Sequence, residues 1–182
     1  MLKVSDNPPI AWPEGKPLED FQGQWWVAHT KSRNEKAFAH DLKSRDVNYF
    51  LPMTWKIRHV RGRKIKSLLP LFGGYLFFCG GESERLEALK TNRIASLIEV
   101  KDQQQLVMEL SAIEKALRTG AQLQSHKSIQ SGQRCIVTAG ALKDIEGIVQ
   151  QSQSGTRLLL KVNMLGQAAS VEVDSDSIEI IE

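Results

Sequence analysis

The chain has 182 residues, of which 41% are hydrophobic and 25% are charged, a balance typical of folded domains and unlike that of a disordered segment. No apolar run approaches the ~20 residues that a membrane-spanning helix requires, and the N-terminal residues lack the apolar core of a secretion signal. The net charge is +3, with 19 Lys and Arg against 14 Asp and Glu in residues 1–120 and 5 against 7 in residues 121–182. Either the two halves meet different partners, or the asymmetry is chance scatter.

Strands and helices alternate in the front half. Residues 1–22 contain four prolines and are expected to form an irregular, mobile leader that Trp12 and Phe21 attach to the surface. The strand at 74–80 lacks polar alternation, so we expect it to be central and covered on both faces. Leu86 and Leu89 are expected to point inward. Apolar spacing predicts, in chain order, strand 24–30, helix 32–46, strands 47–53, 54–60, 63–69 and 74–80, helix 82–92, strand 94–100 and helix 102–120.

The pattern changes in the rear half. Residues 121–130 are polar and aperiodic, and we expect them to form a linker. From residue 131 onward, four or five short β runs are separated by turn signals at Gly140, Gly147, Gly155 and Gly166. The sequence therefore predicts an α+β fold, with an α+β sandwich in residues 23–120 and a small β-barrel in residues 131–182.

We find no grouping of residues that indicates catalysis. The four histidines are scattered, neither cysteine has metal-ligand spacing, and the Gly-rich stretch "GGYLFFCGGE" lacks a P-loop lysine. Cys79 and Cys135 each lie in a strand-like apolar run and are expected to be buried, reduced thiols, which fits a cytoplasmic protein. We expect no enzymatic activity, no cofactor and no metal.

Basic residues concentrate on a predicted hairpin, where a Gly-containing turn follows strand 54–60. Such a projecting basic hairpin suits a phosphate backbone, because each neutralised phosphate releases counterions. The alternative is an edge hairpin that charge keeps from aggregating. The cluster consists of Lys56, Arg58, Arg61, Arg63, Lys64 and Lys66.

The order of these segments resembles the NusG family of transcription elongation factors over residues 24–182. The segments that carry the resemblance are "WWVAHTKSRNEKAFAHDL", "FLPM", "VRGRK", "PLFGGYLF", "SGQRCIVTAGALKDIEGIV" and "LKVNMLGQAASVEV". The resemblance implies an N-terminal NGN domain, with an antiparallel sheet flanked by helices, followed by a KOW domain that forms a small SH3-like β-barrel. The "VRGRK" and "PLFGGYLF" segments look closer to specialised paralogues of the RfaH type than to the housekeeping NusG.

The resemblance also implies a function and partners. The NGN domain would bind the clamp helices of RNA polymerase, bridge the cleft near the non-template DNA strand, suppress pausing and support antitermination. The KOW domain would recruit a partner such as ribosomal protein S10 or Rho. The factor would be a monomer with no membrane partner.

The resemblance carries three sets of candidate residues onto this chain. The set for polymerase binding is His29, Phe72, Tyr75 and Phe77. The set for DNA binding is Lys31, Arg61, Arg63 and Arg93, and the partner-binding loop of the KOW domain is Met164, Leu165 and Gly166.

This chain departs from the family pattern at several of these places. His29 replaces a commoner aromatic residue, Gly73 replaces a proline, and "RLEA" at 85–88 replaces the His–Thr run that some members use to contact the opposing polymerase subunit. Leu165–Gln167 replaces an aromatic-Gly-Arg loop, which puts binding of the usual partners in question.

Two alternatives stay open at this point. The aromatic residues of the candidate patch could all belong to the core, since strand alternation does not place Phe72 and Phe77 on one face. The whole chain could instead be a KOW-type RNA- or ribosome-binding protein with the front domain as a scaffold, although the acidic balance of residues 121–182 argues against RNA.

One family member switches its rear domain to a helical hairpin, but the β-branched runs here predict a barrel.

Overall fold

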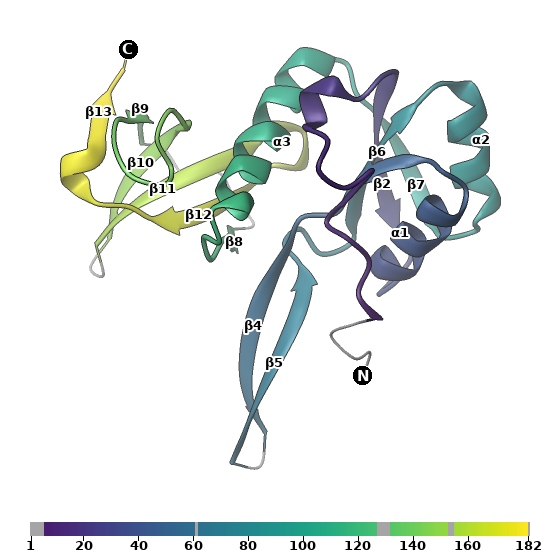
Figure 1. The fold of residues 1–182 in the computed structure, drawn as a ribbon, viewed down its shortest axis with the longest axis horizontal. Helices are drawn as coiled ribbons and strands as arrows, with labels where there is room; N and C mark the ends of the chain where they lie inside the picture. Colours follow the sequence, from purple (N-terminus) through teal and green to yellow (C-terminus); the bar gives the residue numbers. More distant parts are fainter. Residues whose placement is uncertain (1–5, 61, 127–131, 153–154, 182) are drawn as a thin grey trace. The chain divides into compact units, whose positions relative to one another are not determined.

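The protein is described by a computed structural model that covers residues 6–60, 62–126, 132–152 and 155–181 (Figure 1). The chain divides into two compact units, Met1–Gln103 and Gln104–Glu182. Helix α3, Gln103–Arg118, therefore begins at the division and belongs almost entirely to the second unit, whereas the sequence analysis assigned it to the front domain.

The first unit is built on a five-stranded antiparallel sheet with the order β1-β3-β6-β2-β7. Its strands are β1 Ala11–Trp12, β2 Gln24–Thr30, β3 Asn48–Phe50, β6 Tyr75–Gly80 and β7 Ile94–Glu99, and its helices are α1 Glu35–Ser44 and α2 Glu82–Lys90. Strand β6 is central and almost wholly buried, as its unbroken apolar sequence predicts. The described N-terminal unit thus has the mixed architecture expected from the sequence.

The two faces of this sheet carry different side chains, because successive residues of a strand point to opposite faces. Ala28, Leu76 and Phe78 face α1 and α2 and pack with side chains such as Phe38 of α1 and Ala88 of α2 in one buried cluster. The residues between them in sequence face the other way. This second face carries Trp25, Val27 and His29 from β2 and Tyr75, Phe77 and Cys79 from β6.

The backbone of residues 6–22 folds onto the sheet, contrary to the expected mobile leader. Strand β1 pairs with β3 through Ala11 opposite Phe50 and Trp12 opposite Tyr49. Next to this pair, the Leu51 amide donates to the Ile10 carbonyl at 2.7 Å. A proline-rich segment can occupy this place because an edge strand needs donors on only one side.

Side chains of the same segment explain why it is ordered. Leu18 is fully buried, and the Phe21 ring stacks on Trp25 with centroids 5.6 Å apart. Trp12 Nε1 donates to Asp46 Oδ1 at 3.1 Å. The attachment points Trp12 and Phe21 were predicted, but burial of Leu18 was not, and together these contacts outweigh the local turn preference of the prolines.

Helix α2 turns a different side toward the core from the side that the sequence predicted. Its buried residue is Ala88, whereas Leu86 and Leu89 are 47% and 40% exposed. The Glu84 carboxylate accepts a hydrogen bond from the Gly81 amide at 2.7 Å, which sets where the helix begins. Ala88 packs into the buried cluster beneath the sheet, which turns the two leucines toward solvent, so the prediction that they point inward was wrong.

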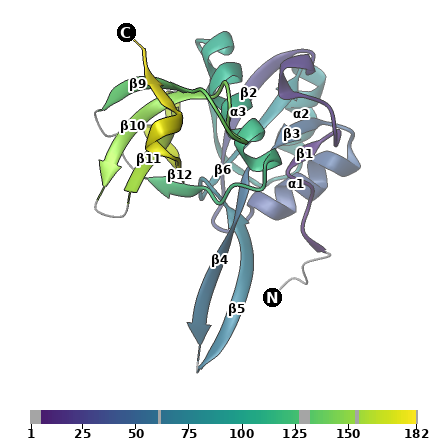
Figure 2. The same cartoon turned by 60° about the vertical axis from the view of Figure 1, so that its left-hand side comes forward.

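Strands β4, Met53–Val60, and β5, Arg63–Pro70, form a separate two-stranded antiparallel sheet. Figure 2 shows this hairpin as a long arm that leaves the five-stranded sheet of the first unit. The hairpin and its turn were predicted from the sequence. The five-stranded sheet and the arm are joined at the base, where Leu71 N donates to the Pro52 carbonyl at 2.8 Å.

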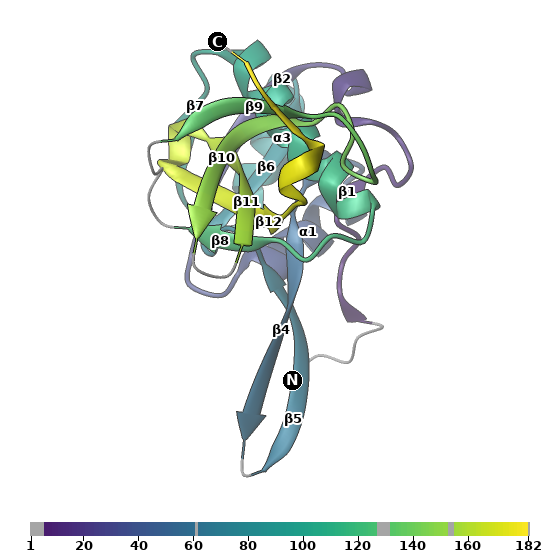
Figure 3. The ribbon, with the colours of Figure 1, turned by 90° about the vertical axis from the view of Figure 1, so that its left-hand side faces the viewer.

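The second unit contains a six-stranded antiparallel sheet with the order β13-β9-β10-β11-β12-β8, whose strands curl around one another (Figure 3). Its strands are β8 Gln124–His126, β9 Gln133–Val137, β10 Glu146–Ser152, β11 Gly155–Val162, β12 Gln167–Glu172 and β13 Ile178–Ile180. Short 3-10 turns cover Leu18–Asp20 (η2) in the first unit and Asn163–Leu165 (η3) and Ser175–Ser177 (η4) here. This β-rich unit is compatible with a KOW domain, and the predicted fold class is confirmed.

Two details of the second unit differ from expectation. Residues 124–126 of the expected linker form β8 and pair with β12, while 127–130 lie outside the described residues. Gly147 lies inside β10 and not in a turn: a Cβ there would approach the Leu159 carbonyl oxygen to 2.7 Å, so glycine is required by the neighbouring strand.

Both cysteines are buried, free thiols, as predicted. Burial raises the pKa of the Cys79 thiol to about 11 and also raises that of Cys135. We expect neither thiol to react with a disulfide reagent near pH 8 until denaturant is added. The pKa of Cys79 is higher in the folded protein than its unfolded value of about 8.5. The stability that the buried thiol contributes is therefore complete below a pH of about 8.5 and is lost as the pH rises through about 11. In urea titrations at increasing pH, Cys79→Ala should lose less stability than the unsubstituted protein, because it retains only the titration of Cys135.

Candidate functional site

One end of the five-stranded sheet brings together two of the residues predicted to bind polymerase. His29 and Tyr75 are directly opposite each other in the β2–β6 register. Their rings are tilted, with centroids 5.1 Å apart. His29 is exposed and Tyr75 is half-buried, so both offer surface to a partner.

The other two predicted residues lie beneath the surface. Phe72 is 1% exposed and Phe77 is 0% exposed. The Phe77 ring meets Phe72 edge-on at 6.4 Å and lies 6.4 Å from the ring of Phe50. Strand alternation places Phe77 on the same face of the sheet as His29 and Tyr75. Phe72 contacts Phe77, so the two buried phenylalanines lie beneath the exposed pair and support it.

The turn before β6 is held by a residue that the sequence analysis did not identify. Glu35 Oε1 accepts a hydrogen bond from the Gly74 amide at 2.7 Å, and the Gly74 carbonyl accepts one from the Thr30 amide at 2.8 Å. Gly74 has φ +86°, a conformation that favours glycine, whereas a Cβ at Gly73 would meet nothing within 4 Å. Hydrogen bonds to Gly74 therefore hold this turn without a proline at position 73. An acidic residue at a helix start gives no sequence signal for this contact.

Two predicted DNA-binding residues lie at the same end of the sheet. The Lys31 amide donates to the Arg93 carbonyl at 2.8 Å, immediately after Thr30, which joins the Gly74 turn. Lys31 is exposed, and its Nζ donates to Asn92 Oδ1 at 2.7 Å. Lys31 thus follows β2 directly and lies two residues beyond His29 in the chain.

The Arg93 guanidinium is already engaged within the first unit. Its Nε forms an ion pair with Asp41 Oδ2 at 2.9 Å, and a terminal nitrogen donates to Asn34 Oδ1 at 2.9 Å. Since Asp41 lies in α1 and Asn34 precedes its first residue, Arg93 links α1 to the start of β7. Lys31 is consequently the more available cation for a phosphate.

A third DNA-binding candidate lies elsewhere in the first unit. Arg63 is exposed on the β4–β5 hairpin, opposite Val60, whereas Arg61 lies outside the described residues. The predicted set is therefore divided between the end of the five-stranded sheet and the hairpin.

The predicted partner loop forms the η3 turn between β11 and β12. Met164 and Leu165 are half-buried, and Gly166 ends the turn with φ +60°. Glu109 of α3 accepts hydrogen bonds from the Asn163 amide, at 3.1 Å, and from the Asn163 side chain. The sequence analysis missed both residues, since their contact joins segments far apart in the chain.

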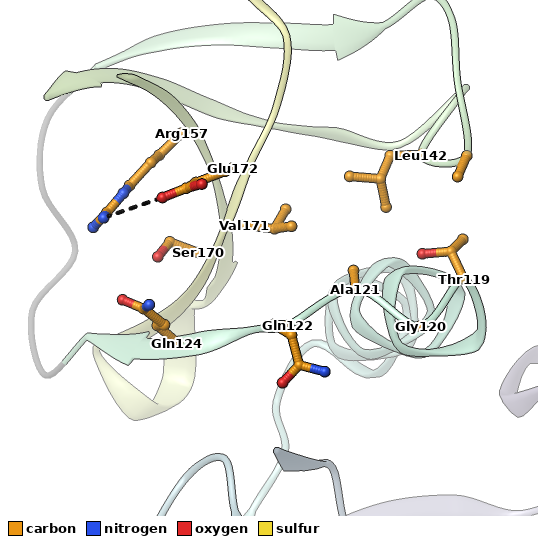
Figure 4. A pocket seen from close by; sticks show the side chains of 11 residues that line it. Thr119, Gly120, Ala121, Gln122, Gln124, Leu142, Arg157, Ser170, Val171 and Glu172 are labelled. Carbon is orange, nitrogen blue, oxygen red and sulfur yellow. Dashed lines mark ion pairs between the residues drawn. The ribbon is translucent and has the colours of Figure 1, made fainter. Parts of the chain in front are cut away.

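A pocket of about 440 Å³ in the second unit lies away from this loop (Figure 4). It is bounded by the end of α3, β8, β11 and β12. On its wall, a terminal nitrogen of Arg157 lies 3.7 Å from Glu172 Oε1, so the two charges offset each other. Residues 164–166 do not line it, and the pocket indicates no specific ligand.

The fold and the site define a two-unit protein with a mixed α/β first unit, a basic hairpin arm and a β-rich second unit. The family model described as "Transcription termination factor nusG" matches residues 23–116, half of the chain. The chain belongs to the NusG family of transcription factors, whose members bind RNA polymerase. A search of curated proteins finds no match. Among the helices in the described parts of the chain, none is both long and apolar enough to cross a membrane.

Proposed function

We propose that this protein is a cytoplasmic transcription elongation and antitermination factor that binds the clamp helices of RNA polymerase through its first unit. The observation that carries the proposal is the adjacency of the His29–Tyr75 pair and Lys31 at one end of the sheet. Bound there, the protein would bridge the cleft beside the non-template strand and suppress pausing. It would act as a monomer, by binding alone, without catalysis or a cofactor.

Elementary energetics support this division of roles. A side chain that becomes buried on a partner contributes about 1.5–3 kcal/mol, and Tyr75 and His29 have surface left to bury. Phe72 and Phe77 have none, so their contribution would be to hold β6 and its turn in place. Lys31 beside the pair would attract a DNA phosphate.

The second unit would recruit a further factor through Met164, Leu165 and Gly166. Ribosomal protein S10 and Rho are the candidates that the family suggests. Because Leu165 and Gln167 replace the usual aromatic and arginine, we propose that this chain is a specialised paralogue of the RfaH type with altered partner preference. Genome-wide occupancy at a few operons would support this role, and broad occupancy would contradict it.

Binding of core RNA polymerase tests the main proposal. We expect the double substitution His29→Ala and Tyr75→Ala to weaken binding at least about tenfold, since each tenfold corresponds to about 1.4 kcal/mol. It should also abolish the effect on pause lifetimes in a transcription assay. Ile180→Ala removes an exposed apolar side chain from the second unit and serves as the matched control.

Unchanged affinity of the double variant would contradict the proposed surface. A protein that does not bind polymerase at all, but whose binding to RNA survives the same substitutions, would instead favour the RNA-binding alternative.

A further inference from the structure

The β4–β5 hairpin carries basic side chains and no acidic ones. No Asp or Glu occurs between Asp46 and Glu82. Five cations of the hairpin are exposed, and within the described parts of the chain no ion pair engages any of them. They are Lys56, Arg58, Arg63, Lys64 and Lys66.

The register distributes these cations over both faces of the hairpin. Residues directly opposite each other share a face. His59 lies opposite Lys64 and Ile57 opposite Lys66 on one face. Arg58 lies opposite Ile65, and Lys56 opposite Ser67, on the other. A ligand that meets only one side would leave half of this charge unused, so the distribution points to a ligand that surrounds the hairpin.

The dimensions of the arm fit a nucleic-acid groove. Met53 and Thr54 are buried at the base, so the six remaining residues of β4, at about 3.3 Å each, give a free length of roughly 20 Å. No third strand joins β4 and β5 among the described residues, so the pair remains a narrow ribbon (Figures 1 and 2). The major groove of B-form DNA, about 12 Å wide, admits a two-stranded β-ribbon.

We propose that the β4–β5 hairpin binds double-stranded DNA by lying in the major groove, with cations of both faces meeting the phosphates of both groove walls. Arg58, Arg63 and Lys64 are its principal contacts. Because side chains cannot read the narrow, deep major groove of A-form RNA, the hairpin should bind duplex DNA more tightly than duplex RNA.

A single strand fits the hairpin less well than a duplex. Single-stranded nucleic acids are held largely by bases that stack on accessible aromatic rings. Trp55, the one aromatic ring other than His59 on these two strands, is half-buried, and Lys66 Nζ lies 4.5 Å from its ring centroid. The hairpin therefore offers charge on two faces but little stacking surface.

This inference does not rest on polymerase binding, because the hairpin and the His29–Tyr75 pair are separate surfaces of the first unit. Its test accordingly uses DNA without polymerase. Fluorescence anisotropy of the full chain with a duplex of about 20 base pairs, between about 50 and 200 mM salt, gives both affinity and the salt slope.

The variant Arg58→Ala, Arg63→Ala, Lys64→Ala removes three exposed cations of the hairpin. We expect weaker binding and a slope of log K against log salt that is shallower by about 2.7, since each phosphate contact contributes about 0.9. The control Lys90→Ala, Lys101→Ala, Lys143→Ala removes the same charge from other exposed positions and should retain the slope. Circular dichroism of both variants confirms that they fold.

The groove itself can be tested with the unsubstituted chain. Glucosylated hydroxymethylcytosine fills the major groove and should weaken binding, whereas netropsin fills the minor groove and should not. Equal slope losses in the two triple variants, tighter binding to duplex RNA or to single-stranded DNA of the same sequence, or competition by netropsin alone would each overturn the proposal.

Discussion

Replacing Phe77 with alanine should lower the free energy of unfolding of the first unit by about 3–5 kcal/mol. The Phe77 side chain is fully buried on the central strand and contacts the rings of Phe50 and Phe72, so its removal leaves a cavity that the surrounding sheet fills only in part. Urea denaturation followed by tryptophan fluorescence measures this unit selectively, because all four tryptophans lie in residues 12–55.

Tyr75→Ala is the matched comparison for this prediction. Tyr75 lies on the same face two residues earlier but is only half-buried, so its loss should cost less than half as much stability while removing polymerase contact surface. If Phe77→Ala left the denaturation midpoint unchanged, the view of Phe77 as buried support would be wrong. Such a result would return Phe77 to the set of direct polymerase contacts.

The double substitution Leu18→Ala and Phe21→Ala should destabilise the first unit by at least about 4 kcal/mol, because a buried Leu→Ala change alone costs about 2–5 kcal/mol and Phe→Ala about 3–5 kcal/mol. Leu18 is 0% exposed and Phe21 is 6% exposed. The stacked Phe21–Trp25 pair would also be lost, so the native tryptophan emission should shift to longer wavelength. Urea denaturation and emission spectra give the two measurements together.

Asp20→Ala is the control for the leader, since Asp20 is exposed in the same 3-10 turn. A surface change of this kind is expected to alter stability by no more than about 0.5 kcal/mol. A double variant as stable as the unsubstituted protein would show that residues 6–22 are dispensable, as a mobile leader would be.

Several elements of the fold follow from local sequence. The apolar run at 74–80 predicts a central strand because a strand covered on both faces has no polar alternation to preserve. The Arg-Gly turn between alternating strands predicts the hairpin, and the β runs after residue 131 predict the β-rich second unit. The motifs around "WWVAHT" and "PLFGGYLF" are enough to indicate the family that the comparison then shows.

The residues of the candidate site also follow from sequence, but the division into exposed and buried residues does not. The motif picks out His29, Phe72, Tyr75 and Phe77 as a set. The β2–β6 register places Phe77 on the same face as His29 and Tyr75. Only the packing of Phe77 against Phe50 and Phe72 separates the buried pair from the accessible one. The capping of that turn by Glu35 depends on a contact between residues 39 positions apart.

The sequence by itself determined the mixed first unit, the basic hairpin, the β-rich second unit and the family, because periodicity, turn residues and charge act over a few neighbouring residues. The tertiary structure decided where Leu18 is buried, which way Leu86 and Leu89 point, and that residues 124–126 add a strand to the second sheet. Each of these depends on a partner far away in the chain, and the burial gained there exceeds the weak local preferences of prolines, short helices and polar segments.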